Sequence, residues 1–336
     1  MTVTATPATS DASTGADPVA GAAAVGSPGR GALAVLAAAT LWGTTGTAAT
    51  FAPDVGPLAI GAAAMGVGGL VQAAAAAGAV RRSAPVLSRH RGVVVLGALS
   101  VAIYPLAFYT SMHLAGVAVG TVVSIGSAPL ASALVERVVD HQRLTRRWMV
   151  GALLGLVGMA LLCLAEAAGA DTSGASGADG GGGATLVLGV LLGLIAGLTY
   201  ALYSWVAHRL MHAGAPSRGA MGAVFGLGGL ALLPVLAVTG APLVASWPNA
   251  AVGVYLALVP MFLGYRLFGR GLARVPASTA TTLSLMEPAV AAVLAVVVVG
   301  ERLGTGGWVG VGMVALCLAV LTVPAGAHRR LLRWRA

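Results

Sequence analysis

The chain contains ten apolar runs, each about as long as the roughly 20 residues that a helix needs to cross a bilayer. Charged residues make up only 9% of the sequence, against about 25% in soluble domains, and this argues strongly against a soluble enzyme. The fold class predicted is therefore an all-α integral membrane protein with ten transmembrane helices. The predicted spans are 31–51, 57–80, 92–112, 117–138, 148–166, 185–207, 218–239, 250–270, 277–299 and 304–324.

The positive charges support the same count of spans. All 19 basic residues are arginines. If the N-terminus is cytoplasmic, every arginine except Arg302 falls in a tail or an internal loop, and arginine is enriched on the cytoplasmic side of membrane proteins. A basic chain can also indicate nucleic-acid binding, but this distribution is explained by topology, so no nucleic-acid partner is predicted. We predict a multi-pass protein of the cell membrane with both termini in the cytoplasm.

The sequence divides into two membrane segments and three connecting or terminal segments. Residues 1–30, rich in Ala, Thr, Ser, Gly and Pro, are predicted to be a disordered cytoplasmic tail. Residues 31–166 and 185–324 each hold five spans, and the Gly-rich segment 167–184, which has no arginine, is predicted to be an external linker. Residues 325–336 form a basic tail, predicted to be cytoplasmic.

The two five-span segments repeat each other. When Pro129 is aligned with Pro288, Leu144 meets Leu303 and Gly151 meets Gly310 without a gap. Because five is an odd number of crossings, the second copy must run through the membrane in the opposite sense. Inverted repeats are the architecture of many secondary transporters, which bind substrate near the midplane between the halves.

Three short stretches resemble those of a known family. Leu41-Trp42-Gly43, Glu287-Pro288 and Gly300-Glu301-Arg302-Leu303 look like the EamA family of the drug/metabolite transporter superfamily, and the resemblance covers roughly residues 31–324. It implies a ten-helix inverted-repeat fold and the transport, often the export, of small metabolites such as amino acids. The first half reads Ser127-Ala128-Pro129 at the corresponding place, so a family role for the acidic residue can be assigned only to Glu287.

Glu287 is the carboxylate predicted to lie well inside an apolar span. Such a group is expensive in a membrane, and a functional site is the default interpretation. Because burial favours the neutral acid, Glu287 could bind and release a proton during transport. The alternative is a structural, protonated glutamate that bonds a backbone carbonyl left free by Pro288.

Pro129 and Pro288 are predicted to be paired breaks in the fourth and ninth spans. Interruptions at corresponding positions of two repeats indicate a transporter binding site, so both are candidates for gating or site formation. A simple packing kink is the alternative.

Aromatic and hydroxyl side chains are the other candidates for the lining of a central cavity. Trp42 and Tyr200 are repeat-related and lie near the middle of their spans, where rings can stack on a ligand or donate a hydrogen bond. The weaker tyrosine candidates are Tyr104, Tyr109, Tyr203 and Tyr265. The hydroxyl candidates are Ser124, Ser127, Ser284, Thr44 and Thr45, which alternatively bond their own backbone or join helices. The tryptophans predicted to form interfacial belts are Trp148, Trp247, Trp308 and Trp334.

Two further groups of residues are given structural interpretations. Gly189, Gly193 and Gly197 recur every four residues, as do Gly151 and Gly155, which favours close packing of helices within the chain. Arg266 and Arg270 are interpreted as side chains that extend to the membrane interface, with attraction of an anionic substrate at the inner mouth as the alternative.

Signals for other chemistry are missing from the sequence. It has no phosphate-cradling Gly-x-x-x-x-Gly-Lys-Ser/Thr loop, no His or Cys pair at metal-ligand spacing and no acid–base pair inside a span. No enzyme activity, no metal and no cofactor are predicted.

The sequence thus predicts a secondary transporter or exporter that acts by alternating access. Its substrate is predicted to be a small organic metabolite, with an amino acid or related compound as first choice, and its other partners are membrane lipids. The cavity is predicted between the first, third, fourth, sixth, eighth and ninth spans. Alternatives are a passive facilitator of the same fold and, in a different class, a polytopic membrane enzyme or a non-transporting accessory protein. The sequence does not identify the substrate, the transport direction, the coupling ion or the oligomeric state.

Overall fold

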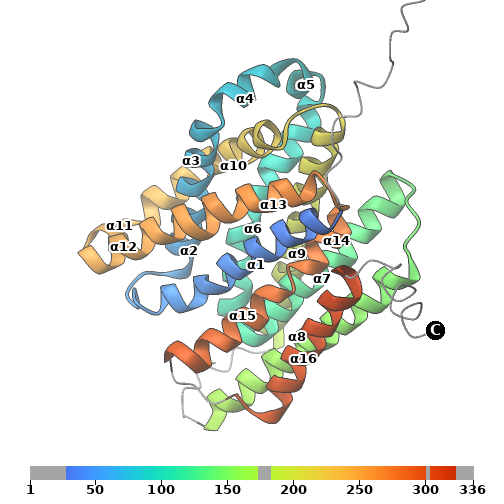
Figure 1. The fold of residues 1–336 in the computed structure, drawn as a ribbon. Coiled ribbons are helices and arrows are strands. Elements are labelled where there is room, and N and C mark those ends of the chain that lie inside the picture. The colour runs from blue at the N-terminus through green and yellow to red at the C-terminus, as the bar shows by residue number, and fades with distance from the viewer. Residues whose placement is uncertain (1–27, 173–182, 300–302, 323–336) are drawn as a thin grey trace, which may run out of the picture.

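The computed structural model describes residues 28–172, 183–299 and 303–322 (Figure 1). Within these ranges the secondary structure is helical, and ten helices are long and apolar enough to cross a membrane. The prediction of an all-α membrane protein with ten spans is therefore confirmed. Most of both predicted tails and of the linker, together with Gly300, Glu301, Arg302 and Trp334, lies outside the described residues.

Each span consists of one helix or of several helices in line. In the first half, span 1 is α1 (Pro28–Ala49), span 3 is α6 (Arg91–Ala115), span 4 is α7 (Val117–Val139) and span 5 is α8 (Arg146–Thr172). Span 2 is built from α2 (Pro57–Gly61), the π-helical stretch η1 (Ala62–Val67) and α3 (Gly68–Ala75), and the short helices α4 (Ala77–Arg82) and α5 (Ala84–Arg89) lead from it to span 3.

The second half follows the same plan. Span 6 is α9 (Gly183–His212), span 7 is α10 (Ser217–Thr239) and span 10 is α16 (Thr305–Thr322). After the short α11 (Ala241–Val244), span 8 comprises α12 (Trp247–Leu256), the π-helical η2 (Ala257–Gly264) and α13 (Tyr265–Leu272). Span 9 comprises α14 (Ala277–Leu283), α15 (Met286–Leu294) and the π-helical η3 (Ala295–Val299). Such π-helical turns are rare and often occur at functional sites.

The packing of the spans has the symmetry of two related repeats. Span 3 packs on span 6 as span 8 packs on span 1, and span 4 packs on span 6 as span 9 packs on span 1. Spans 2 and 7, 4 and 9, and 5 and 10 pack as equivalent pairs. Figure 1 shows α8 and α16 together on one side of the molecule and α3 and α10 on the other. The remaining six spans, which lie between these two pairs, are the ones predicted to line a cavity.

Glycines allow the closest helix contacts. A Cβ atom on Gly189 would lie 2.7 Å from the Cβ of Ala115, and one on Gly193 would lie 2.9 Å from Ser111 Oγ. On span 5, Gly151 and Gly155 face Leu321 and Cys317 of α16. The glycine spacing therefore serves packing within the chain, as expected from the sequence.

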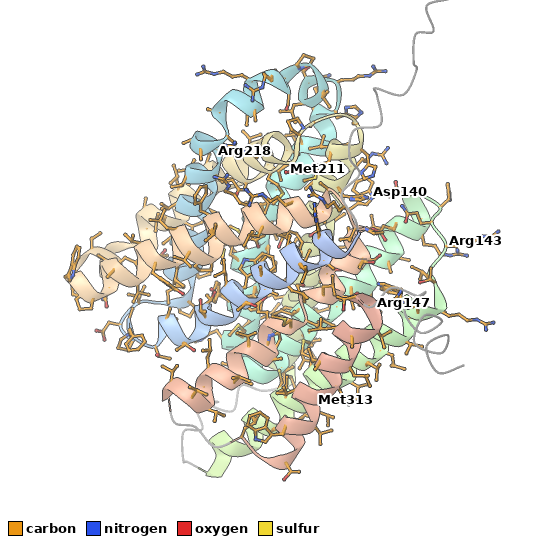
Figure 2. All side chains as sticks on the ribbon, in the orientation of Figure 1. Asp140, Arg143, Arg147, Met211, Arg218 and Met313 are labelled. Carbon is orange, nitrogen blue, oxygen red and sulfur yellow. The ribbon has the colours of Figure 1, made fainter. Side chains whose placement is uncertain are left out.

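Several arginine-bearing ends of the spans lie on the same side of the protein. We call this side, which carries Arg143, Arg209 and Arg218, the arginine-rich end. Arg209 after span 6 pairs with Asp140 after span 4 at 3.0 Å. Arg218 at the start of span 7 donates to the carbonyl of Ala75 at the end of span 2, at 2.8 Å. Figure 2 shows Arg143 projecting away from the protein at this end.

Candidate functional site

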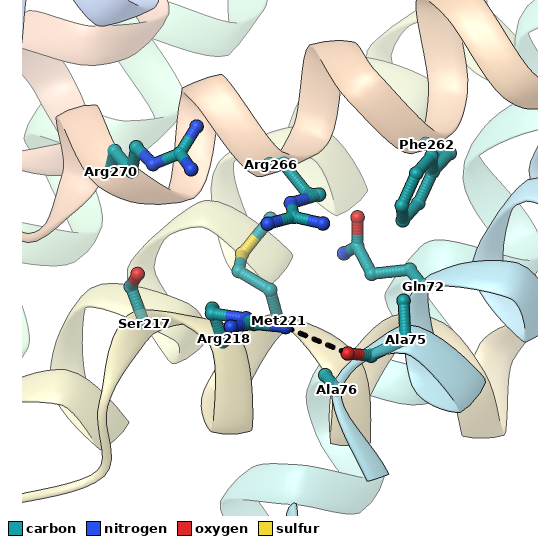
Figure 3. A pocket seen from close by; sticks show the side chains of 9 residues that line it. All are labelled: Gln72, Ala75, Ala76, Ser217, Arg218, Met221, Phe262, Arg266 and Arg270. Carbon is teal, nitrogen blue, oxygen red and sulfur yellow. Dashed lines mark hydrogen bonds between the residues drawn. The ribbon is translucent and has the colours of Figure 1, made fainter. Parts of the chain in front are cut away.

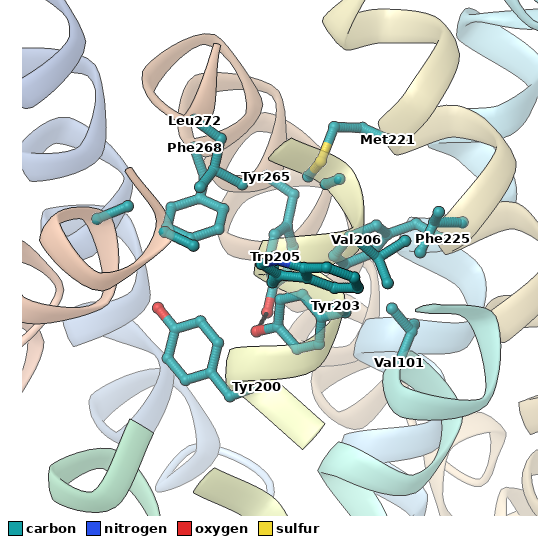
Figure 4. Packing of buried hydrophobic residues seen from close by; sticks show 14 of the residues in the cluster. Val101, Tyr200, Tyr203, Trp205, Val206, Met221, Phe225, Tyr265, Phe268 and Leu272 are labelled. Atoms are coloured by element: carbon teal, nitrogen blue, oxygen red, sulfur yellow. Dashed lines mark hydrogen bonds between the residues drawn. The ribbon is translucent and has the colours of Figure 1, made fainter. Parts of the chain in front are cut away.

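Rings from both repeats meet in the centre of the protein. We call Trp42, Tyr104, Tyr200, Tyr203, Tyr265, Phe225 and Phe268 the aromatic cluster. The ring centroids of Trp42 and Tyr265 are 4.9 Å apart, those of Tyr200 and Tyr203 are 5.2 Å apart, and those of Tyr104 and Tyr200 are 5.6 Å apart. Figure 4 shows several of these rings from spans 6, 7 and 8 facing one another. The structure thus brings together Trp42 and four of the five tyrosines selected from the sequence.

Hydrogen bonds fix the polar ends of these rings. Trp42 Nε1 donates to the carbonyl of Pro260 in η2 at 3.0 Å, and Gly264 leaves room for the indole. Tyr200 donates to Ser284 Oγ at 2.8 Å. The hydroxyl oxygens of Tyr203 and Tyr265 lie 2.9 Å apart. Because these polar groups are paired and most of the rings are buried, the cluster is a fixed aromatic contact between the repeats.

Span 9 is interrupted beside this cluster. Helix α14 ends at Leu283 and α15 begins at Met286, so Pro288 lies in the first turn of a new helix, where its missing N–H is not needed. The N–H of Glu287 donates to the carbonyl of Ser284 at 2.9 Å. Pro129, in contrast, lies inside the continuous helix α7. The expectation of paired helix breaks is therefore met only at Pro288.

Glu287 projects from the start of α15 into the protein interior. Its side chain is surrounded by protein and has intermediate solvent accessibility. Four phenols lie close enough to interact with it electrostatically, namely Tyr104, Tyr109, Tyr200 and Tyr265. No hydrogen bond or ion pair joins the carboxylate to another described residue. A structural bond from Glu287 to a freed carbonyl is thus not present in the described part of the chain.

The hydroxyl candidates divide into two groups. Ser284 belongs to the site through Tyr200 and also donates to the carbonyl of Thr281 at 2.8 Å. Ser127 Oγ and the backbone carbonyl of Ser124 face Gly197 of α9, whereas Ser124 Oγ is buried without a hydrogen-bond partner among the described residues. These contacts agree with a helix-packing role for Ser127, and the cavity assignment of both serines stays a prediction.

Residues of span 1 and span 3 next to the cluster complete the set of candidates. Thr44 Oγ1 lies 2.8 Å from the hydroxyl of Tyr255, a residue that the sequence analysis did not select. Thr45 Oγ1 is buried without a hydrogen-bond partner among the described residues. Tyr109 packs beside Phe108, with 5.2 Å between ring centroids, and over Gly61.

A second buried carboxylate, Glu136 of α7, was missed by the sequence analysis. Its side chain is 2% exposed, and Oε1 accepts a hydrogen bond from the N–H of Ser278 at 3.1 Å, at the start of α14. Glu136 lies in the last turn of α7, so Glu287 remains the carboxylate predicted to lie well inside a span, but it is not the only buried acid. Glu136 was not selected because the charged residues Arg137 and Asp140 lie close to it in the sequence. Such a charged stretch is normally interpreted as a helix end that faces water.

Glu136 is part of a polar connection between spans 4, 6 and 9 at the arginine-rich end. Asp140 accepts hydrogen bonds from Trp205 Nε1 at 2.6 Å and from Arg209 at 3.0 Å. We call Glu136, Asp140, Trp205, Arg209 and Ser278 the latch. Its contacts hold one repeat against the other at this end of the protein.

Replacement of Glu136 by alanine is expected to lower the free energy of unfolding by about 1–2 kcal/mol, because the first N–H groups of α14 lose their acceptor. Glu136→Gln keeps an acceptor oxygen and should lose less. Thermal unfolding of the purified protein in detergent measures both. Asp54→Ala, at an exposed acid, is the control. Equal melting of Glu136→Ala and the wild type would show that the latch does not hold the repeats together.

The tryptophans expected at the interface do not behave alike. Trp247 is 83% exposed and Trp308 is 50% exposed, as suits side chains that face lipid or headgroups. Trp148 is only 8% exposed and packs against Ala133 and Ala152. Trp148 is thus part of the contact between spans 4 and 5, which corrects its assignment to an exposed belt.

Comparison with known proteins agrees with the fold and the repeats. The model of the EamA-like transporter family matches residues 29–164 and 187–323. The chain is 34% identical to the uncharacterized transporter YwfM of Bacillus subtilis over 86% of this chain and 93% of that protein. It is 29% identical to the threonine/homoserine exporter RhtA of Salmonella typhimurium over 66% of this chain and 65% of that protein.

A solved crystal structure shares the fold, with a TM-score of 0.68 and 22% identity over 90% of this chain and 98% of that chain. The family match spans both repeats, and the resemblance noted in the sequence is confirmed. The chain belongs to the EamA-like transporter family of the drug/metabolite transporter superfamily and is a multi-pass membrane protein that transports a small molecule.

Proposed function

We propose that this chain exports an amino acid or a related small metabolite across the cell membrane by alternating access. The observation that carries the proposal is the carboxylate of Glu287, which has no partner among the described residues and lies beside an aromatic cluster built from both repeats. A carboxylate complements the ammonium group of an amino acid, and aromatic rings complement its carbon atoms and its positive charge. The similarity to an exporter named for threonine and homoserine supports this substrate class and this direction.

The arginine bias supports assigning the arginine-rich end to the cytoplasm. With this assignment, the latch closes the cytoplasmic side of the site, while Glu287, Tyr104 and Tyr109 keep partial accessibility. The arrangement supports a state that is closed toward the cytoplasm. Export then requires the latch to open, so that substrate reaches the aromatic cluster from inside.

A transport screen in proteoliposomes tests the proposal. Vesicles with the purified chain are loaded with radiolabelled amino acids, nucleosides, sugars or cationic drugs, with and without a pH gradient, and efflux is compared with protein-free vesicles. We expect amino acids to leave faster than from the control vesicles. Efflux of another class alone would reject the amino-acid assignment. Substrate exchange without any gradient-driven accumulation would identify a passive facilitator.

Trp42→Ala is expected to lower the efflux rate about tenfold. The substitution removes a ring that would contact the substrate, and it also removes the aromatic contact between Trp42 and Tyr265. Trp42→Phe keeps a ring but loses the hydrogen bond to Pro260 and should have an intermediate rate. The control is Trp247→Ala, at an exposed tryptophan. Wild-type efflux in Trp42→Ala vesicles with equal protein content would remove this residue from the pathway.

A further inference from the structure

A small cavity lies at the arginine-rich end, between α3, α10 and α13. Its volume is about 20 Å³, and the polar side chains around it are Gln72, Arg218, Arg266, Arg270 and Ser217. Figure 3 shows the Gln72 amide and the Arg266 guanidinium facing the same space, with Arg218 below and Arg270 beside it. The three arginines come from two different spans, and Gln72 comes from a third. The residues therefore converge only in the folded protein.

Gln72 is the unusual member of this group. Its side chain is 3% exposed, and neither the amide oxygen nor the amide nitrogen has a hydrogen-bond partner among the described residues. Buried amides are normally paired, because an unpaired one has lost its water without gaining a protein partner. Both ends of the Gln72 amide are thus available to a ligand in the cavity.

Among the described residues, no acidic side chain forms an ion pair with the three arginines. The one ion pair between described residues joins Arg209 to Asp140, outside this cavity. Arg218 donates one hydrogen bond to the carbonyl of Ala75, and the Arg266 guanidinium lies 5.4 Å from the ring centroid of Phe262. These contacts hold the side chains in place without neutralising them. Three like charges close together, beside an unpaired amide, form a surface complementary to an anion.

The cavity is separate from the aromatic cluster. Met221 lines it and is itself only 2% exposed, because it belongs to the same buried core as Phe225 and Tyr265. Figure 4 shows Met221 next to this core. A ligand of the cavity therefore does not occupy the proposed transport site.

We propose that Gln72, Arg218, Arg266 and Arg270 bind the phosphate group of an anionic ligand. A cavity of this size holds one or two oxygen atoms. A non-bridging phosphate oxygen would thus accept hydrogen bonds from the Gln72 amide N–H groups, while the guanidinium groups donate to the remaining oxygens. The phosphate belongs either to an anionic lipid headgroup at the membrane surface or to a soluble phosphate. The occupied site would join spans 2, 7 and 8 at this end.

The test uses the full-length protein in a neutral detergent. Thermal unfolding is measured during titration with dioctanoyl-phosphatidylglycerol, with dioctanoyl-phosphatidylcholine and with inorganic phosphate at constant ionic strength. A ligand that binds only the folded state raises the melting temperature in a saturable way. We expect phosphatidylglycerol or phosphate to do so, and phosphatidylcholine not to. Saturation by inorganic phosphate identifies a soluble ligand, and saturation by phosphatidylglycerol alone identifies a headgroup.

Matched variants locate the site. Arg266→Gln and Gln72→Leu should each raise the apparent Kd about tenfold, since each removes a hydrogen-bonding group from the ligand. Arg81→Gln removes an exposed arginine that does not line the cavity and should leave the Kd unchanged. The proposal is overturned if phosphatidylcholine binds as tightly as phosphatidylglycerol in the wild type, if neither phosphatidylglycerol nor phosphate saturates, or if Arg266→Gln keeps the wild-type Kd. The lipid comparison needs no variant, so a misfolded variant would not leave the question open.

Discussion

Glu287→Gln is expected to lower accumulation of substrate driven by a pH gradient at least about tenfold, while exchange of substrate between the two sides continues at a reduced rate, because an amide binds an ammonium group less tightly than a carboxylate does. Glutamine has nearly the shape of glutamate but cannot release a proton. Because the Glu287 side chain has no hydrogen-bond or ion-pair partner in the described part of the chain, its replacement breaks no such side-chain contact there. The loss should therefore fall on coupling rather than on folding. Proteoliposomes with an imposed pH gradient measure accumulation, and vesicles without a gradient measure exchange.

Asp54→Asn is the matched control, because it removes an exposed acid that does not belong to the aromatic cluster. Its accumulation and exchange should equal those of the wild type. If Glu287→Gln keeps wild-type accumulation with an unchanged pH dependence, Glu287 does not couple transport to protons. A loss of both accumulation and exchange would instead make the residue a substrate ligand, which also agrees with its place beside the cluster.

The fold could be predicted because hydropathy and arginine distribution both report how the chain crosses a membrane. Ten spans were expected, and the described residues contain ten, from Gly29–Ala49 to Thr305–Thr322. The finer structure of the spans was not predictable in this way. The π-helical stretches η1, η2 and η3 lie within apolar runs, where a change in helical pitch leaves no trace in composition.

The site was predicted only in part, for a physical reason. Trp42 and Tyr200 could be selected because the repeats place them in equivalent spans, and the structure brings their ring centroids to 6.4 Å. Ser124 and Ser127 were selected by residue type alone. In a span that is apolar on all sides, hydropathy does not show which way a helix face points, and it did not reveal that Ser127 Oγ faces Gly197.

Polar residues at helix ends were the hardest to recognise. Gln72 and Glu136 both lie near arginines in the sequence, where a polar side chain is expected to face water. Their burial follows from packing between spans that are distant in the sequence. The only signal for Glu136 in the sequence was indirect, namely the start of span 9 at Pro276-Ala277. The first N–H groups of a helix need acceptors, and a buried carboxylate from another span can supply one.

Gly197→Val is expected to be the most destabilising of the substitutions considered, with a loss of about 3 kcal/mol in the free energy of unfolding. A Cβ atom at position 197 would clash with Ser127 Oγ and lie 2.7 Å from the carbonyl oxygen of Ser124. A side-chain hydroxyl can rotate away, but the backbone carbonyl cannot move without shifting α7 relative to α9. Because this contact joins the two repeats, the shift would also displace Tyr200 and Tyr203, which lie on the same helix.

The melting temperature of purified Gly197→Val should therefore fall by roughly 5–10 °C, together with a loss of efflux. Gly92→Val is the matched control, since a Cβ at position 92 meets nothing within 4 Å. Gly197→Ala adds only the Cβ atom and should fall between the two. If Gly197→Val melts like Gly92→Val, α7 and α9 are not in close contact in the membrane protein. In that case the glycines spaced by four on α9 would have to serve another surface, such as contact with a second copy of the chain.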